Sequence, residues 1–192
     1  MWEFLKEYIA QPDTIGAIAP SGRYLASAMA DSIDFAKARC IVEYGSGTGV
    51  FTREVILRKK PDTVYIVIEQ NGRFYEMLRK QFQRTPGVVL VHGDASDVCG
   101  FLEEQGFRHA DYIISGLPFT SLPEQVSRRI LSGTRKAVGT EGIFTTFQYT
   151  LLRKRFLEEY FHIREIRRIW RNLPPAYILN MKPSDNLVAP IS

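Results

Sequence analysis

Short runs of apolar and β-branched residues recur along the middle of the chain, and longer segments of mixed polarity separate them. The run Thr-Val-Tyr-Ile-Val-Ile at 63–68 is continuous rather than alternating, as expected for a strand buried on both faces. Such runs predict strands at residues 40–44, 63–69, 88–91, 110–115 and 142–149, with helices between them. Strands that alternate with helices are typical of an α/β fold with a mostly parallel sheet.

The segments that flank this core predict further elements. Residues 2–10 have the pattern of an amphipathic helix, and a second helix is expected from about Ser21 to Ser32. Helices are also expected at 124–138 and 153–160. A closing β-hairpin is expected from strands 161–170 and 176–181, because the prolines in the segment 171–175 that joins them continue neither element.

The sum of these elements is a seven-stranded, mostly parallel sheet with an antiparallel last strand and helices on both faces, which is a Rossmann-like α/β fold. We expect a single domain over 1–192. Its expected parts are an N-terminal helical cap at 1–37, a core at 38–183 and a tail at 184–192.

Composition limits the classes of protein that this chain can belong to. Of its 192 residues, 45% are hydrophobic and 24% are charged, which suits one well-filled domain. The two cysteines are too few for a disulfide framework and lack the spacing of metal ligands, so we expect a reducing compartment and no metal.

Because no apolar run reaches the ~18 residues of a membrane span and no signal peptide is evident, we expect a cytoplasmic protein. A net charge of +4 favours an anionic partner, either RNA or an acidic membrane face.

A glycine-rich turn follows the first expected strand and is the most informative motif. Its spacing is Gly-x-Gly-x-Gly, unlike the Gly-x-Gly-x-x-Gly of dinucleotide sites, and an acidic residue precedes it. That carboxylate repels a pyrophosphate but favours a cationic ligand. We interpret the turn as the site for the amino-acid end of S-adenosylmethionine. The candidate residues are Glu43, Gly45, Ser46, Gly47, Thr48 and Gly49.

Polar residues follow the next three strands, at the carboxyl ends where open α/β sheets bind ligands. An acidic residue after the second strand is suited to hold ribose hydroxyls, and a carboxylate after the third strand is suited to accept from an adenine amino group. The motif after the fourth strand also lies at this edge. These cofactor-binding candidates are Glu69, Gln70, Asp94, Ala95 and Ser115.

The fourth-strand motif is the expected place of the methyl acceptor, since it should lie close to the sulfonium. We predict that Ser115, Gly116, Leu117 and Pro118 form the catalytic segment. RNA adenine dimethylases have Asn where this chain has Gly116, so no amide side chain orients a planar amine here. The backbone carbonyls of this segment remain as acceptors for an aliphatic amine.

With these motifs the chain resembles the bacterial phospholipid N-methyltransferases, which convert phosphatidylethanolamine stepwise to phosphatidylcholine. It is related more distantly to the rRNA adenine dimethyltransferases. The matching stretches are 16–21, 43–52, 92–95, 115–118 and 170–176. The resemblance implies a class I methyltransferase that uses S-adenosylmethionine and releases S-adenosylhomocysteine. It also implies a membrane surface as partner through residues 2–10, and hence a peripheral place on the inner face of the membrane.

Substrate contacts are expected from a second set of residues. Arginine holds phosphate with two parallel hydrogen bonds, so we expect Arg171, together with Asn172, to bind the lipid phosphate. Aromatic faces suit methylated ammonium groups, and the candidates are Tyr24, Phe119, Tyr149 and Tyr177. Because no histidine belongs to the fourth-strand motif, we expect catalysis by proximity and desolvation rather than by a dedicated base.

Three alternatives compete with lipid methylation. The first is an rRNA adenine-N6 dimethyltransferase, with RNA as partner, which shares the Leu-Pro-aromatic motif and the basic charge. The second is a small-molecule or protein N-methyltransferase on the same scaffold. The third is a non-enzymatic interaction protein that has kept a decayed cofactor fold, against which the intact glycine turn and both carboxylates argue. The sequence predicts no oligomeric state.

Overall fold

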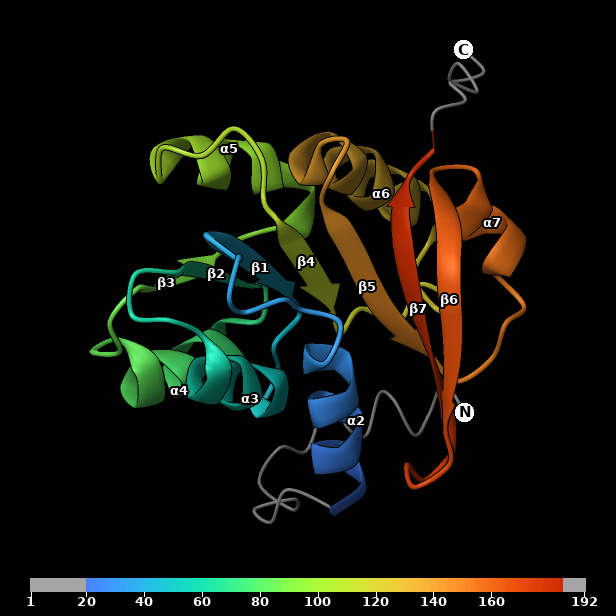
Figure 1. Ribbon diagram of the computed structural model, residues 1–192, viewed down its shortest axis with the longest axis horizontal. Helices are drawn as coiled ribbons and strands as arrows, with labels where there is room; N and C mark the ends of the chain where they lie inside the picture. The colour runs from blue at the N-terminus through green and yellow to red at the C-terminus, as the bar shows by residue number, and fades with distance from the viewer. Residues whose placement is uncertain (1–19, 185–192) are drawn as a thin grey trace.

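A computed structural model describes residues 20–184 of the chain. Seven strands form one sheet in the order β3-β2-β1-β4-β5-β7-β6 (Figure 1). The strands are β1 (Cys40–Tyr44), β2 (Val64–Glu69), β3 (Val88–His92), β4 (Tyr112–Ser115), β5 (Ile143–Gln148), β6 (Phe161–Ile169) and β7 (Ala176–Pro183). The expected helix at 2–10 and all but the first residue of the expected tail at 184–192 lie outside the described residues.

Pairing directions confirm the expected fold. The five strands β3, β2, β1, β4 and β5 pair in parallel. β7 inserts antiparallel beside β5, and β6 pairs antiparallel with β7 at the edge. The expected strands therefore form, with boundaries that differ by at most two residues. The central strands β1 and β2 are buried along almost their whole length, as their apolar runs predict.

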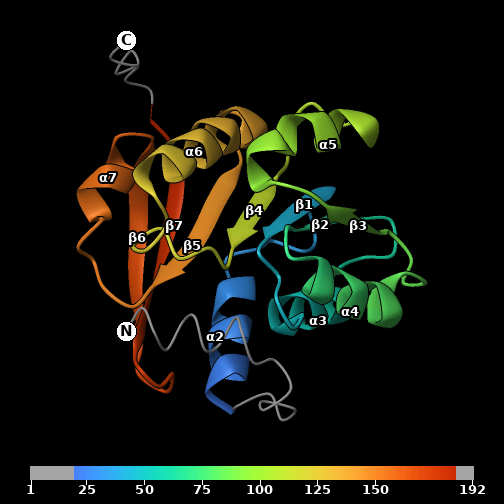
Figure 2. The ribbon, with the colours of Figure 1, turned by 180° about the vertical axis from the view of Figure 1, so that it is seen from behind.

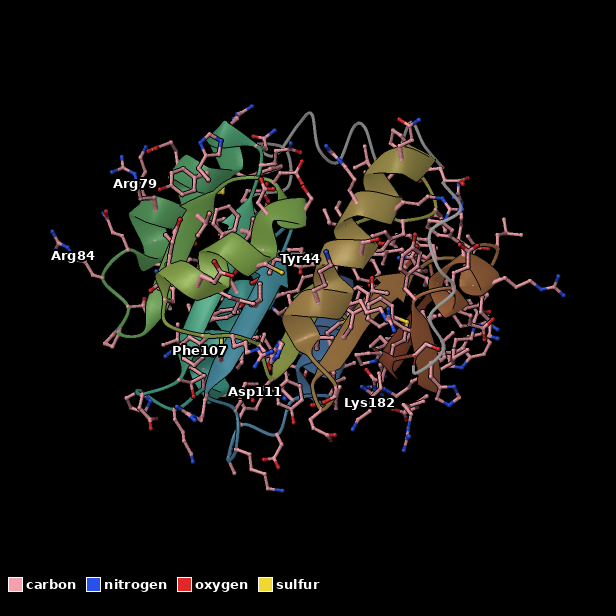
Figure 3. The ribbon with its side chains drawn as sticks, turned by 90° about the horizontal axis from the view of Figure 1, so that it is seen from above. Tyr44, Arg79, Arg84, Phe107, Asp111 and Lys182 are labelled. Carbon is pink, nitrogen blue, oxygen red and sulfur yellow. The ribbon has the colours of Figure 1, made fainter. Side chains whose placement is uncertain are left out.

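Helices cover both faces of the sheet (Figures 1 and 2). On one face lie α5 (Val98–Glu104), α6 (Glu124–Val138) and α7 (Lys154–Glu158), and on the other lie α2 (Pro20–Ala30), α3 (Val50–Arg58) and α4 (Gly72–Phe82). Side chains of β1 divide between the two cores, since Val42 and Tyr44 face the first group and Ile41 faces the second. Figure 3 shows Tyr44 below the α5 and α6 layer, where its hydroxyl lies 3.3 Å from Thr134 Oγ1.

The edge of the sheet where β1 begins is fixed by contacts of the half-buried Asp111 side chain. The Asp111 carboxylate accepts from the backbone amides of Arg39 at 2.7 Å and Cys40 at 2.9 Å, which sets the start of β1 beside β4. Asp111 and Lys182 mark this side of the molecule in Figure 3. The carboxyl ends of the parallel strands lie at the opposite edge, and that edge is therefore where a ligand site is expected.

Helix α2 is attached to both of its neighbours. Arg58 of α3 donates to Ser27 Oγ at 2.6 Å and pairs with Asp31 at 2.8 Å. Arg167 of β6 donates to the Ala28 carbonyl and lies 3.7 Å from the Asp31 carboxylate. These contacts hold α2 beside the β6–β7 hairpin, whose tip extends past the sheet next to the first turns of α2 (Figures 1 and 2).

Among residues 20–184, no helix has the length and apolar character needed to cross a bilayer.

Candidate active site

The glycine-rich turn between β1 and α3 has the conformation that its sequence predicts. Gly45, Gly47 and Gly49 all have positive φ, at 62°, 53° and 80°, where a Cβ is strained. A Cβ at Gly45 would lie 2.7 Å from Leu117 Cδ2, whereas a Cβ at Gly47 would meet nothing within 4 Å. The turn therefore packs tightly against the fourth-strand segment at Gly45 and is open at Gly47, as a cradle for a ligand requires.

A buried carboxyl group lies beneath this turn. Glu43 is 0% exposed, and its Oε2 accepts from Thr52 Oγ1 at 2.8 Å and from the Tyr65 hydroxyl. Burial raises the pKa of Glu43 to about 7, although both hydrogen bonds oppose this shift. Its Oε1 and the Ser46 hydroxyl are buried without a hydrogen-bond partner among the described residues. Unpartnered buried oxygens are costly in isolation, and a cationic ligand satisfies them, so this part of the site fits an ammonium group.

Two further carboxylates lie at the ends of β2 and β3, at the same edge of the sheet. Glu69 Oε2 accepts from the Gly47 amide and its Oε1 accepts from the Asn71 amide, both at 2.8 Å. Asp94 caps the following turn by accepting from the Ser96 amide at 2.8 Å. Gln70, which is exposed, reaches Asp94 Oδ2 at 3.5 Å. The structure thus brings the candidates after β2 and β3 together with the glycine turn, with buried Ala95 beside Asp94.

The fourth-strand segment lies directly against the glycine turn. The Gly116 amide donates to the Tyr44 carbonyl at 2.9 Å, and the Leu117 amide donates to Ser115 Oγ at 3.1 Å. A Cβ at Gly116 would lie 2.8 Å from the Gly45 carbonyl oxygen, closer than real Cβ atoms approach. This contact accounts for glycine at 116, because any side chain there would displace the glycine turn. Pro118 follows, half-buried, on the same edge.

Three residues near this segment were missed in the sequence analysis. Phe51 lies 3.6 Å from the Cβ position of Gly116, and its ring centroid lies 5.7 Å from that of Phe147. Phe147 in turn lies 5.6 Å from the Tyr149 ring. Gln148, 3% exposed, points its amide at the Leu117 carbonyl at 3.5 Å. Phe51 closes the glycine motif and was detectable there, whereas Phe147 and Gln148 carry no local signal within a strand.

Four of the expected substrate contacts lie at three places in the structure. Tyr24 and Arg171 lie together, with the guanidinium 5.3 Å from the tyrosine ring centre, and Tyr149 lies in the aromatic row described above. Tyr177 is half-buried and stacks against Arg168 at 5.3 Å.

Two of the expected substrate contacts need correction. Phe119 is 0% exposed and packs edge-on against Phe144 in the core, because the turn after Pro118 directs it inward. The Asn172 side chain is 4% exposed and donates to the Pro174 carbonyl at 2.6 Å. Phe119 therefore belongs to the core and Asn172 to the turn that it braces, rather than to a surface that a substrate reaches.

Comparison with known proteins agrees with this geometry. A family model described as ribosomal RNA adenine dimethylase matches residues 23–162. The chain belongs to this methyltransferase family. It is also 31% identical over 178 residues to an ornithine lipid N-methyltransferase of Singulisphaera acidiphila, a match that covers 90% of this chain and 91% of the relative. That relative confirms the resemblance to lipid N-methyltransferases.

Solved structures of known proteins share this fold. N-methyltransferase NodS from Bradyrhizobium japonicum WM9, solved with S-adenosyl-L-homocysteine, superposes with a TM-score of 0.70 at 12% identity, over 96% of this chain and 98% of that one. TrmN from Thermus thermophilus gives a TM-score of 0.65 at 15% identity, over 83% of this chain and 48% of TrmN, so this chain spans about half of its length. This member of the family is an S-adenosylmethionine-dependent N-methyltransferase.

Proposed function

We propose that this enzyme methylates the primary amine of a membrane aminolipid. The observation that carries the proposal is the relative that acts on ornithine lipid, which matches nine-tenths of this chain at 31% identity. Ornithine lipid is therefore the first acceptor to test. Phosphatidylethanolamine, the acceptor implied by the phospholipid N-methyltransferases, is the second, and both present an aliphatic amine together with an anionic group.

The cofactor is assigned to residues at the carboxyl edge of the sheet. Glu43 and Ser46 offer buried oxygens to the ammonium group, and the glycine turn leaves space above Gly47. Glu69 is assigned to the ribose hydroxyls, and Asp94 to the adenine amine. When bound, the cofactor supplies an electrophilic methyl group on a sulfonium.

An aliphatic amine fits the fourth-strand segment better than a nucleobase does. A base-methylating site needs a side-chain acceptor for the planar amine, but the Gly45 carbonyl leaves no room for an Asn side chain at Gly116. A tetrahedral amine needs no such planar partner. Phe51, Phe147 and Tyr149 form an aromatic row beside Gly116, and their faces suit the methylated, cationic products.

The proton balance follows from the chemistry of the acceptor. The attacking nitrogen gives its lone pair to the methyl carbon while the carbon–sulfur bond breaks and its electron pair stays on sulfur. An alkylammonium with a pKa near 10.4 costs roughly 4–5 kcal/mol to hold neutral at pH 7, and removal of the amine from water offsets part of that cost. Desolvation and orientation at this edge are therefore the main contributions of the chain, and the proton leaves to water.

The headgroup anion is assigned to Arg171. Its guanidinium lies over the exposed Tyr24 ring at the tip of the β6–β7 hairpin, and this tip adjoins the carboxyl end of β5. Arginine binds phosphate or carboxylate with two parallel hydrogen bonds, so it serves either lipid.

One assay tests the proposal. The protein is incubated with methyl-labelled S-adenosylmethionine and one of three acceptors: vesicles with ornithine lipid, vesicles with phosphatidylethanolamine, or total RNA. We expect label in the lipid phase. Label in RNA alone would favour the activity named by the family model and overturn the proposal. A Gly45→Val variant, which places a side chain against Leu117, serves as the inactive control.

A further inference from the structure

The tip of the β6–β7 hairpin presents large apolar side chains to solvent. Trp170 is 68% exposed and Leu173 is 85% exposed, in a molecule where most large apolar side chains are buried. The tip is held in shape from within, because the buried Asn172 amide donates to the Pro174 carbonyl. The turn therefore holds both apolar side chains in solvent-exposed positions. Packing within the described part of the chain does not explain why large apolar residues stand at these positions.

Cationic side chains surround these apolar groups. The guanidinium of Arg168 lies 3.6 Å from the Trp170 ring centre, and that of Arg171 lies 5.3 Å from the ring centre of Tyr24, which is 48% exposed. Residues 168–176, which form the tip, hold Arg168 and Arg171 and no Asp or Glu, and α2 also contains no acidic residue. We call Tyr24, Arg168, Trp170, Arg171 and Leu173 the hairpin-tip surface.

The hairpin-tip surface lies close to the candidate active site. Tyr177 pairs with Gln148, the last residue of β5, and Ile169 pairs with Ala176, so residues 170–175 extend just beyond the carboxyl end of β5. That edge also carries the glycine turn and the fourth-strand segment. Figures 1 and 2 show the tip projecting beside the first turns of α2 from opposite views.

We propose that the hairpin-tip surface docks the enzyme on an anionic lipid bilayer. Trp170 and Leu173 enter the boundary between headgroups and acyl chains, and Arg168 pairs with lipid phosphates around them, while Arg171 remains available to the headgroup of the acceptor. Tryptophan favours this boundary, and basic side chains are attracted to anionic leaflets. The docking places the acceptor site at the membrane surface. This inference rests on the proposed lipid acceptor but concerns the bilayer surface rather than the methylated molecule.

The first test reports on binding without any methyl transfer. The chain contains two tryptophans, Trp2 and Trp170, so Trp2→Phe leaves Trp170 as the sole tryptophan. Vesicles of phosphatidylcholine and phosphatidylglycerol with brominated acyl chains contain no primary amine and quench a tryptophan that enters the bilayer. We expect the Trp170 emission to shift to shorter wavelength and to be quenched. An unchanged spectrum with vesicles that bind the protein overturns the proposal, as does a shift caused by RNA alone.

A matched pair of leucine variants gives a second readout. Leu173→Ser should weaken vesicle binding about tenfold, because an exposed leucine gains about that factor when it is buried in lipid. Leu57→Ser is the control, since Leu57 is 81% exposed but lies near the far end of α3. Arg168→Gln should weaken binding to anionic vesicles and leave the much weaker binding to phosphatidylcholine vesicles unchanged. Equal effects of both leucine variants, or none from either, contradict the proposal.

A third measurement separates this inference from the proposed function. Methylation is assayed on aminolipid in vesicles and on a short-chain aminolipid dispersed as monomers. Loss of docking by Leu173→Ser should lower the first rate and spare the second. Vesicle binding through Trp170 without methylation of any lipid would overturn the proposed acceptor and leave the docking intact. Lipid methylation that is insensitive to Leu173 would overturn the docking and leave the acceptor intact.

Discussion

At the residue scale, Glu43 is a fully buried carboxyl group that is only partly satisfied by hydrogen bonds. It lies at the end of a central strand, fully buried, and yet one of its oxygens has no partner among the described residues. Thr52 and Tyr65 satisfy the other oxygen, but they do not compensate for burial, so the pKa of the free enzyme's Glu43 is raised to about 7. A ligand that brings positive charge to the unpartnered oxygen favours the ionised form.

Cofactor binding should therefore release a proton in mildly acidic solution. At pH 6, below its raised pKa, Glu43 is mostly protonated in the free enzyme, and an ammonium group beside it lowers that pKa. Binding of S-adenosylhomocysteine at pH 6 should release up to one proton and tighten as pH rises toward 8. Calorimetry in buffers of different ionisation enthalpy measures this release.

Glu43→Gln is the matched variant for this measurement, because it keeps an acceptor for the Thr52 and Tyr65 hydroxyls and does not titrate. The difference in proton release between the two proteins isolates Glu43 from the titration of the ligand. Equal release by both proteins would make Glu43 a purely structural acceptor.

The close approach of the Gly45 carbonyl oxygen explains why residue 116 is a glycine. Gly116→Ala places a methyl group 2.8 Å from the Gly45 carbonyl oxygen, and neither backbone can move without shifting the cofactor turn. We expect cofactor affinity to fall by about two orders of magnitude or more, measured by calorimetry, in a protein that remains folded by circular dichroism. Gly100→Ala is the control, since a Cβ there meets nothing within 4 Å in helix α5, and it should bind the cofactor normally. Normal affinity in Gly116→Ala would show that the turn adapts.

At the scale of elements, the strands were predictable and their mutual contacts were not. The apolar runs at 40–42 and 64–68 predict buried strands from local sequence alone, and the glycine spacing predicts the tight turn that follows the first of them. The contact between Gly116 and Gly45 joins residues that lie 71 positions apart and carries no local signature. The inward rotation of Phe119 depends likewise on Phe144, a residue of another strand. The hydrophobic pattern therefore predicts which helices and strands form. Packing between distant segments decides whether a single side chain in a turn points into the core or toward solvent.

Arg171 at the hairpin tip is predicted to bind the anionic group of the aminolipid. Arg171→Ala should raise the apparent KM for the aminolipid about tenfold while cofactor affinity stays unchanged, because the Arg171 guanidinium lies over the Tyr24 ring at the hairpin tip and not in the glycine turn. Arg164→Ala is the matched control, since it removes an equal charge from an exposed position near the other end of β6. Kinetics with aminolipid in detergent micelles of fixed composition separate this effect from docking. An unchanged KM would remove the anion-binding role of Arg171.

The distribution of charge over the whole molecule is uneven. The full chain carries a net charge of +4, and residues 166–183 alone hold four basic side chains without an acidic one, so the rest of the sequence is balanced. Two of these basic side chains, Arg168 and Arg171, lie on the hairpin-tip surface beside the carboxyl edge of the sheet. The other two are paired with carboxylates elsewhere, Arg167 with Asp31 and Lys182 with Glu141. A net charge concentrated next to an active site orients the whole enzyme toward an anionic surface, which a uniform charge of the same size does not do.

This asymmetry predicts a salt dependence that differs between two forms of one substrate. Raising NaCl from about 0.05 M to about 0.5 M shortens the screening length several-fold and should lower methylation of aminolipid in anionic vesicles by a similar factor. Methylation of the short-chain, monomeric aminolipid should change little, because transfer within the site does not depend on long-range attraction. Rates on both substrates are compared for the native chain and Arg168→Gln, whose vesicle rate should be less sensitive to salt. If salt inhibits both substrates equally, screening acts within the site itself, and the segment 166–183 has no part in bringing the enzyme to the membrane.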